Sequence, residues 1–186
     1  SGPRQAGKTF LIENKLKPDL VLNMDLPKNR ISFKQFPDFI IDWYQTTIGR
    51  FPEKVETPGN KPLVFIDEIH KVMGWRNIMK GTFDRTAHAV DYVASGSSAF
   101  KVRRQDRGDS LAGRAIWLNL FPISFREYVE FADPTIKMPK TWTAGDALAE
   151  LCRANVNEQE KLRRLWEEYF RFGSFPECLL RKDDLF

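Results

Sequence analysis

Cysteine and histidine are scarce in this chain, and long apolar runs are missing from it. The 186 residues include 2 cysteines and 2 histidines. Cys152 and Cys178 have neither zinc-site spacing nor the spacing of a disulfide framework, which favours a reducing cytoplasm. His70 and His88 are too few for a site built from several histidines. No apolar run approaches the ~18 residues of a membrane-spanning helix, so we expect no contact with a membrane.

A large excess of positive or negative charge is also missing. Charged residues make up 29% of the chain and hydrophobic residues 42%, and the net charge is only +4. This small excess permits nucleic acid as a partner without requiring it. The basic residues between positions 101 and 107 are interrupted by Asp106 and followed by Asp109. We therefore interpret this stretch as a solvated loop in preference to a nucleic-acid surface.

The most informative feature that is present is a phosphate-binding loop. Residues 2–9 read Gly-Pro-Arg-Gln-Ala-Gly-Lys-Thr, the form G-x-x-x-x-G-K-[ST], which chance would produce with a probability of about 1%. Backbone amides of such a loop surround phosphate, Lys8 reaches the outer phosphates and Thr9 offers its hydroxyl to Mg²⁺. The predicted nucleotide-contacting residues are Gly2, Pro3, Arg4, Gln5, Ala6, Gly7, Lys8, Thr9 and Phe10.

A second motif follows downstream, where an apolar run ends in two acids. Residues 64–68 read Val-Phe-Ile-Asp-Glu. We predict that Asp67 lies near Thr9 and holds Mg²⁺ through its water shell. We predict that Glu68 faces the γ-phosphate and orients or deprotonates the attacking water. Alone, this motif would fit a buried strand that ends in two solvated acids, but the upstream loop favours the functional interpretation.

Three further side chains are candidates with open alternatives. Ser95 follows the next predicted strand and can contact the γ-phosphate as a sensor, with Ser97 as the alternative; a simple Ser-Gly turn is equally compatible. Arg114 either stabilises charge on the transferred phosphoryl group, in cis or from a neighbouring subunit, or is a surface arginine or part of a structural ion pair. His70, two residues after Glu68, is more typical of a packing residue than of a catalyst.

Hydrophobic patterning predicts an α/β fold. Apolar runs over 19–25, 62–67, 89–95 and 115–120 predict strands, and helices are expected between and after them, over 8–16, 31–47, 75–84, 124–131, 144–154 and 157–172. Pro37 marks a helix start, and Ser124 with Glu127 forms a capping box. Alternation of strands and helices predicts a parallel sheet covered on both faces, with the ligand at the carboxyl ends of its strands.

These motifs, in this order, resemble a prokaryotic AAA+ superfamily of predicted ATPases, in which an AAA-type domain is fused to a C-terminal domain of unknown function. The resemblance covers roughly residues 1–132, and residues 169–177 are similar to the turn that opens the fused domain. The residues that carry it are 2–9, 64–72, Ala-Ser-Gly-Ser-Ser at 94–98, Leu-Ala-Gly-Arg at 111–114 and Phe-Pro-Ile-Ser-Phe-Arg-Glu at 121–127.

The resemblance implies a P-loop NTPase fold with strand order 5-1-4-3-2, ATP in preference to GTP, and Mg²⁺. It assigns the loop roles to Gly2–Thr9, the acid roles to Asp67 and Glu68, and the sensor role to Ser95. The implied organisation is an AAA+-type domain over 1–132 that lacks its first strand, a linker over 133–143, and a helical segment over 144–186 leading into a truncated C-terminal domain.

Two functions remain open from the sequence. The first is an ATPase whose hydrolysis of ATP drives conformational change; the alternative is a nucleotide-gated switch, or a DNA-associated binding module, with negligible turnover. Because only Ser1 precedes the loop, we expect no turnover from this stretch alone. Expected partners are ATP or ADP and a protein partner or a second copy of the chain, with nucleic acid weakly supported.

Overall fold

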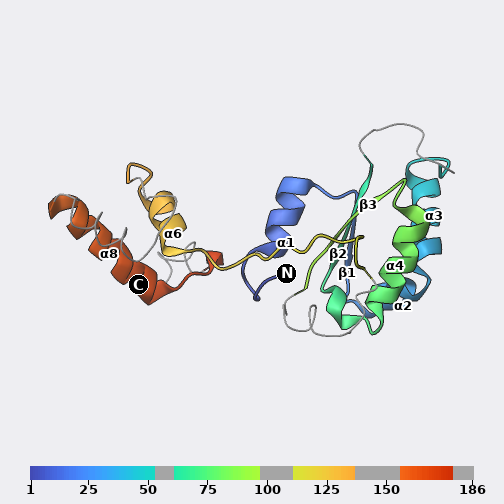
Figure 1. Ribbon diagram of the computed structural model, residues 1–186, viewed down its shortest axis with the longest axis horizontal. Helices are drawn as coiled ribbons and strands as arrows, with labels where there is room; N and C mark the ends of the chain where they lie inside the picture. The colour runs from blue at the N-terminus through green and yellow to red at the C-terminus, as the bar shows by residue number, and fades with distance from the viewer. Residues whose placement is uncertain (53–60, 97–110, 137–155, 178–186) are drawn as a thin grey trace. The chain divides into compact units, whose positions relative to one another are not determined.

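The computed structural model describes residues 1–52, 61–96, 111–136 and 156–177 (Figure 1). The chain forms two compact units, Ser1–Leu120 and Phe121–Phe186. Ser97, the basic stretch and the helix expected over 144–154 lie outside the described residues, as does most of the expected linker. The domain boundaries expected from the sequence stay a prediction.

The first unit contains a parallel sheet whose strands are β1 (Leu20–Asn23), β2 (Leu63–Asp67) and β3 (Asp91–Ala94), in the order β1-β2-β3. Central β2 is a continuous apolar run, as expected for a parallel strand that is buried on both faces. The α/β class with a parallel sheet is confirmed. In the expected strand order 5-1-4-3-2, β1, β2 and β3 correspond to strands 2, 3 and 4, which are neighbours in that order.

Helices lie on both faces of this sheet, with α1 on one side and α2, α3 and α4 on the other (Figure 1). Helix α3 has Pro37 in its first turn, where a missing N–H costs nothing, so the predicted start is confirmed. The helical segments of the unit are α1 (Lys8–Leu11), the π-helix η1 (Ile12–Leu16), α2 (Pro27–Ser32), the 3-10 helix η2 (Phe33–Gln35), α3 (Phe36–Thr47), the 3-10 helix η3 (Ile69–Lys71) and α4 (Trp75–Thr86).

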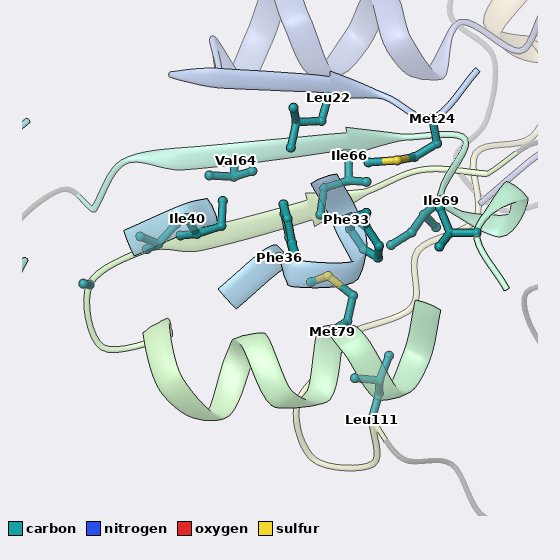
Figure 2. Packing of buried hydrophobic residues seen from close by; sticks show 13 residues of the cluster. Leu22, Met24, Phe33, Phe36, Ile40, Val64, Ile66, Ile69, Met79 and Leu111 are labelled. Carbon is teal, nitrogen blue, oxygen red and sulfur yellow. The ribbon is translucent and has the colours of Figure 1, made fainter. Parts of the chain in front are cut away.

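The core of the unit lies between the sheet and helices α3 and α4 (Figure 2). Alternate residues of β2 face it, and the segments before and within α3 contribute aromatic rings. Burying each such side chain contributes about 1.5–3 kcal/mol. The fully buried members of the cluster are Met24, Phe33, Phe36, Ile40, Val64, Ile66, Ile69 and Val90. This packing fixes the carboxyl end of β2, where the two acids of the second motif lie.

The strand predicted over 115–120 is not formed as a strand, although its end pairs with the start of the chain. The N–H of Leu120 donates to the carbonyl of Ser1 at 2.7 Å, and the amino group of Ser1 donates to the carbonyl of Leu118 at 2.5 Å. These two bonds have the pattern of a parallel bridge. Among the described residues, Ser1 is the sole residue that pairs with segment 115–120 in this way. The segment therefore lacks a ladder of hydrogen bonds along its length.

The second unit contains α6 (Phe125–Ala132) and α8 (Val156–Phe172), which pack against each other. The Tyr128 hydroxyl donates to Glu168 at 2.8 Å, joining the two helices. The predicted capping box is confirmed, because Ser124 and Glu127 exchange side-chain and backbone hydrogen bonds. These bonds lower the pKa of Glu127. Among the described helices of the chain, none is both long and apolar enough to cross a membrane.

We expect Ser124→Ala to weaken the start of α6, because the amide of Glu127 loses its capping oxygen. The loss should be about 1 kcal/mol, which corresponds to about fivefold faster exchange of amide hydrogens in the first turn. Hydrogen–deuterium exchange followed by mass spectrometry measures it. Ser124→Thr, which keeps a capping hydroxyl, is the control and should exchange as the wild type does. Equal exchange in Ser124→Ala and the wild type would contradict the role of the cap.

Candidate functional site

The loop at residues 2–7 turns back on itself and leads into α1. Gln5 and Gly7 have φ angles of 61° and 81°, so the backbone is left-handed at two positions of the loop. Gly7 tolerates this conformation because it has no Cβ. The Leu11 N–H donates to the Gly7 carbonyl at 2.9 Å, which starts the helix at this point. Successive amides in such a turn form a concave surface that binds anions.

Lys8 lies over this loop. Its Nζ donates to the carbonyl oxygens of Gly2 and Pro3, at 2.9 and 2.5 Å. Burial lowers the pKa of Lys8, and the negative charges of Glu68 and then Asp67 oppose this shift. The loop and the two acids of the second motif are therefore close enough in space to interact electrostatically, as the sequence predicts for a shared phosphate site.

Asp67 joins three parts of the site. The Thr9 hydroxyl donates to its Oδ2 at 3.0 Å, the Glu68 amide donates to its Oδ1 at 3.0 Å, and the Ser95 hydroxyl donates to Oδ1 as well. Asp67 is 7% exposed and Ser95 4% exposed. A buried carboxylate is tolerated when donors surround it. Because each donor comes from a different segment, Asp67 holds the loop helix, β2 and the end of β3 together.

Glu68 adopts a left-handed conformation, with φ 54° and ψ 37°, immediately after β2. This conformation is uncommon for a residue with a Cβ and is frequent at functional sites. The following segment is η3, and its position is fixed because the Ile69 N–H donates to the Ser95 carbonyl at 3.0 Å. The side chain of Glu68 thus leaves the strand end on the same edge of the sheet as Asp67.

The remaining predicted site residues lie in different surroundings. Arg4 and Phe10 are exposed at the surface. Arg114 forms an ion pair with Asp84 of α4, with Nε and Oδ1 at 2.7 Å, and is not among the side chains that contact Asp67. Ser95 contacts Asp67, whereas Ser97 lies outside the described residues. The role of Ser95 or Ser97 as the sensor stays a prediction, as does the charge-stabilising role of Arg114.

One contact that the sequence did not suggest lies beside Glu68. The Nδ1 atom of His70 is 3.3 Å from Glu68 Oε2. The sequence favoured His70 as a local packing residue over a catalyst, and hydrophobic periodicity gives no sign of a turn directly after the strand. The available signal was the position of His70, two residues after a candidate base at a strand end.

The donors present fit Mg²⁺, although the described residues contain no group of three or more His, Cys, Asp or Glu side chains able to hold a metal. Mg²⁺ at phosphate sites uses one or two protein oxygens and takes the rest from phosphate and water. The Thr9 hydroxyl and the Asp67 carboxylate, 3.0 Å apart, are hard oxygen donors of this kind. They could hold the ion together with a phosphate chain.

Comparison with known families gives one clear match. The sequence model of a family described as an AAA domain matches residues 1–129 of this chain. The matched region includes the loop, the two acids, Ser95 and Arg114, as well as all three strands of the sheet.

Similar proteins occur in a bacterium and an archaeon, and both carry the description of an uncharacterised protein. The relative from Haemophilus influenzae is 25% identical over 189 residues, which cover 100% of this chain and 40% of the relative. One from Methanocaldococcus jannaschii is 27% identical over 197 residues, covering 96% of this chain and 37% of the relative. The chain thus spans about two fifths of the length of these relatives.

We expect Gly2→Ala to destabilise the first unit, because a Cβ at Gly2 would overlap with the backbone carbonyl of Leu120. Forcing extra volume into a packed contact costs about 1–3 kcal/mol, which should lower the melting temperature by a few degrees. The matched control is Gly81→Ala in α4, where nothing lies within 4 Å of the added Cβ. That change should not destabilise the protein, since alanine favours helix. Equal melting temperatures for Gly2→Ala and the wild type would contradict the close approach.

Proposed function

Because the chain belongs to the family of AAA domains, which bind nucleotides, we propose that it binds ATP with Mg²⁺ and hydrolyses it to drive a conformational change. One observation carries this proposal. Thr9 from the loop and Ser95 from the end of β3 both donate to Asp67, while Glu68 acts electrostatically on Lys8. These contacts support a site in which the phosphate loop and the two acids surround one place at the carboxyl ends of the strands.

In the proposed reaction, a water oxygen attacks the γ-phosphorus and the bond between that phosphorus and the β–γ bridging oxygen breaks. Lys8 leaves the carbonyl oxygens of its own loop and pairs with the phosphate oxygens. Glu68 accepts the proton of the attacking water. ADP and inorganic phosphate are the products. Mg²⁺ held by Thr9 and Asp67 would neutralise charge on the phosphate chain.

The proposed activity implies ligands and partners for the whole protein. We propose ATP and ADP as small-molecule ligands, and a protein partner or a second copy of the chain as the recipient of the conformational change. The small net charge of +4 gives nucleic acid little support. A reducing cytoplasmic location is proposed from the two cysteines, which lack zinc or disulfide spacing.

Lys8→Ala and Glu68→Gln separate binding from hydrolysis. In the full-length gene product, we expect Lys8→Ala to weaken ATP binding about tenfold or more, because a charged donor to phosphate is lost. Glu68→Gln should keep the wild-type affinity and lower phosphate release by about 100-fold or more, since the proton acceptor is gone. Titration with a fluorescent ATP analogue and a phosphate-release assay measure the two effects.

Two exposed residues serve as matched controls for these variants. Lys80→Ala on α4 and Glu13→Gln on η1 remove the same charges away from the acids and should behave as the wild type. Binding without phosphate release in the wild type would favour the nucleotide-gated switch over the ATPase. Failure to bind ATP at all would contradict the proposal.

Asp67→Asn tests the assignment of the metal. Asparagine can keep hydrogen bonds to Thr9, Ser95 and the Glu68 amide, because its oxygen accepts and its amide group donates. The variant lacks the negative charge that favours a cation. We expect Mg²⁺ to raise ATP affinity in the wild type and to have little effect on it in Asp67→Asn, measured by titration with Mg²⁺ and with EDTA. An equal Mg²⁺ effect in both proteins would exclude a role of Asp67 in holding the ion.

A further inference from the structure

The His70 imidazole lies against the carboxylate of Glu68 in a sheltered position. His70 Nδ1 and Glu68 Oε2 are 3.3 Å apart, and only 14% and 18% of the two side chains are exposed. Nδ1 is buried and has no hydrogen-bond partner among the residues that the structure describes. A distance of 3.3 Å lies close to the range of N–H···O bonds, so a small rotation of either side chain would form one.

The backbone holds His70 firmly beside Glu68. Glu68 stands between β2 and η3 in a left-handed conformation, and His70 lies within η3. The Lys71 N–H donates back to the Glu68 carbonyl at 3.0 Å, and the Lys71 ammonium forms an ion pair with Asp25. Together with the bond from Ile69 to Ser95, these contacts fix η3 at both ends. The imidazole is therefore attached to a rigid support.

The Glu68 carboxylate interacts with two groups: it lies 3.3 Å from His70 Nδ1 and acts electrostatically on Lys8. Of the two acids that act on Lys8, Glu68 is the one with the larger effect in raising its pKa against burial. Contact with His70 is therefore compatible with a carboxylate directed toward the loop, where the phosphates of a nucleotide would lie. A carboxylate without a neighbour at its Oε2 atom would be free to rotate about its side-chain bonds.

We propose that His70 is a positioning residue for Glu68: its Nδ1–H donates to the carboxylate and keeps it directed toward the attacking water. This inference rests on the proposed function, because it assigns Glu68 the role of proton acceptor. His70 does not contact phosphate in this scheme and acts only through Glu68. Correct placement of a reacting group contributes strongly to rate, and a displacement of about 1 Å can lower it about 100-fold.

His70→Phe and His70→Asn test the proposal as a pair. Phenylalanine keeps an aromatic ring but has no nitrogen, whereas the side-chain amide of asparagine places an N–H close to the position of Nδ1. In the full-length gene product, we expect His70→Phe to lower kcat about tenfold or more while KM and ATP affinity stay within about twofold. His70→Asn should restore kcat to within a few-fold of the wild type.

Further measurements separate positioning from a general loss of structure. His88→Phe changes the other histidine, which contacts the Pro52 carbonyl at 2.8 Å and should leave kcat unchanged. In a Glu68→Gln background, His70→Phe should cause no additional loss of the residual rate, since the carboxylate it positions is gone. If His70→Phe does not fold, His70→Leu gives the same comparison with His70→Asn.

The outcomes distinguish this inference from the function on which it rests. Unchanged kcat in His70→Phe, or an equal loss in His70→Phe and His70→Asn, overturns the positioning role while the ATPase stands. A parallel loss of ATP affinity also overturns it, because a positioning residue for water activation should not alter binding. Absence of phosphate release from the wild type overturns the proposed function, and this inference with it.

Discussion

The buried carboxylate of Asp67 is the constraint on which the site depends. An ionised group in the protein interior is strongly unfavourable unless donors surround it. Here the donors come from the first turn of the loop helix, from the backbone after β2 and from the residue after β3. Each of these segments must therefore take its observed place for the carboxylate to be satisfied. Because a buried carboxylate needs hydrogen-bond donors, burial of Asp67 requires Thr9 and Ser95 to lie beside it.

The parallel arrangement of the strands is what makes this convergence available. Register pairs Asn23 with Asp67 across β1 and β2, and β3 runs beside β2 in the same direction. All three strands thus end at one edge, where side chains from distant parts of the sequence meet. The core on the α3 and α4 side holds this edge in place, since Val64 and Ile66 of β2 are fully buried there. Glu68 then leaves the strand through a left-handed turn that would be unfavourable without such support.

Sequence patterning predicted the features that depend on local chemistry. The strand over 63–67 follows from an uninterrupted apolar run, the start of α3 from Pro37, and the start of α6 from its capping box. Features set by contacts between distant segments were not predictable in this way. Residues 115–120 have the composition of a strand, but strand formation requires a neighbour to pair with along its length. The contact of His70 with Glu68 depends on a backbone turn that no hydrophobic period encodes.

Charge at the edge of the sheet bears on whether the proposed nucleotide would bind together with a cation. Asp67 and Glu68 both act electrostatically on the partly buried ammonium of Lys8. A polyphosphate alone would meet repulsion from both acids, which opposes the attraction of Lys8 and of the loop amides. A divalent cation changes this balance, because it attracts the phosphates and the acids alike. The hydroxyl of Thr9 beside Asp67 supplies an uncharged oxygen for such an ion. The two acids are therefore consistent with a phosphate site that functions with a cation.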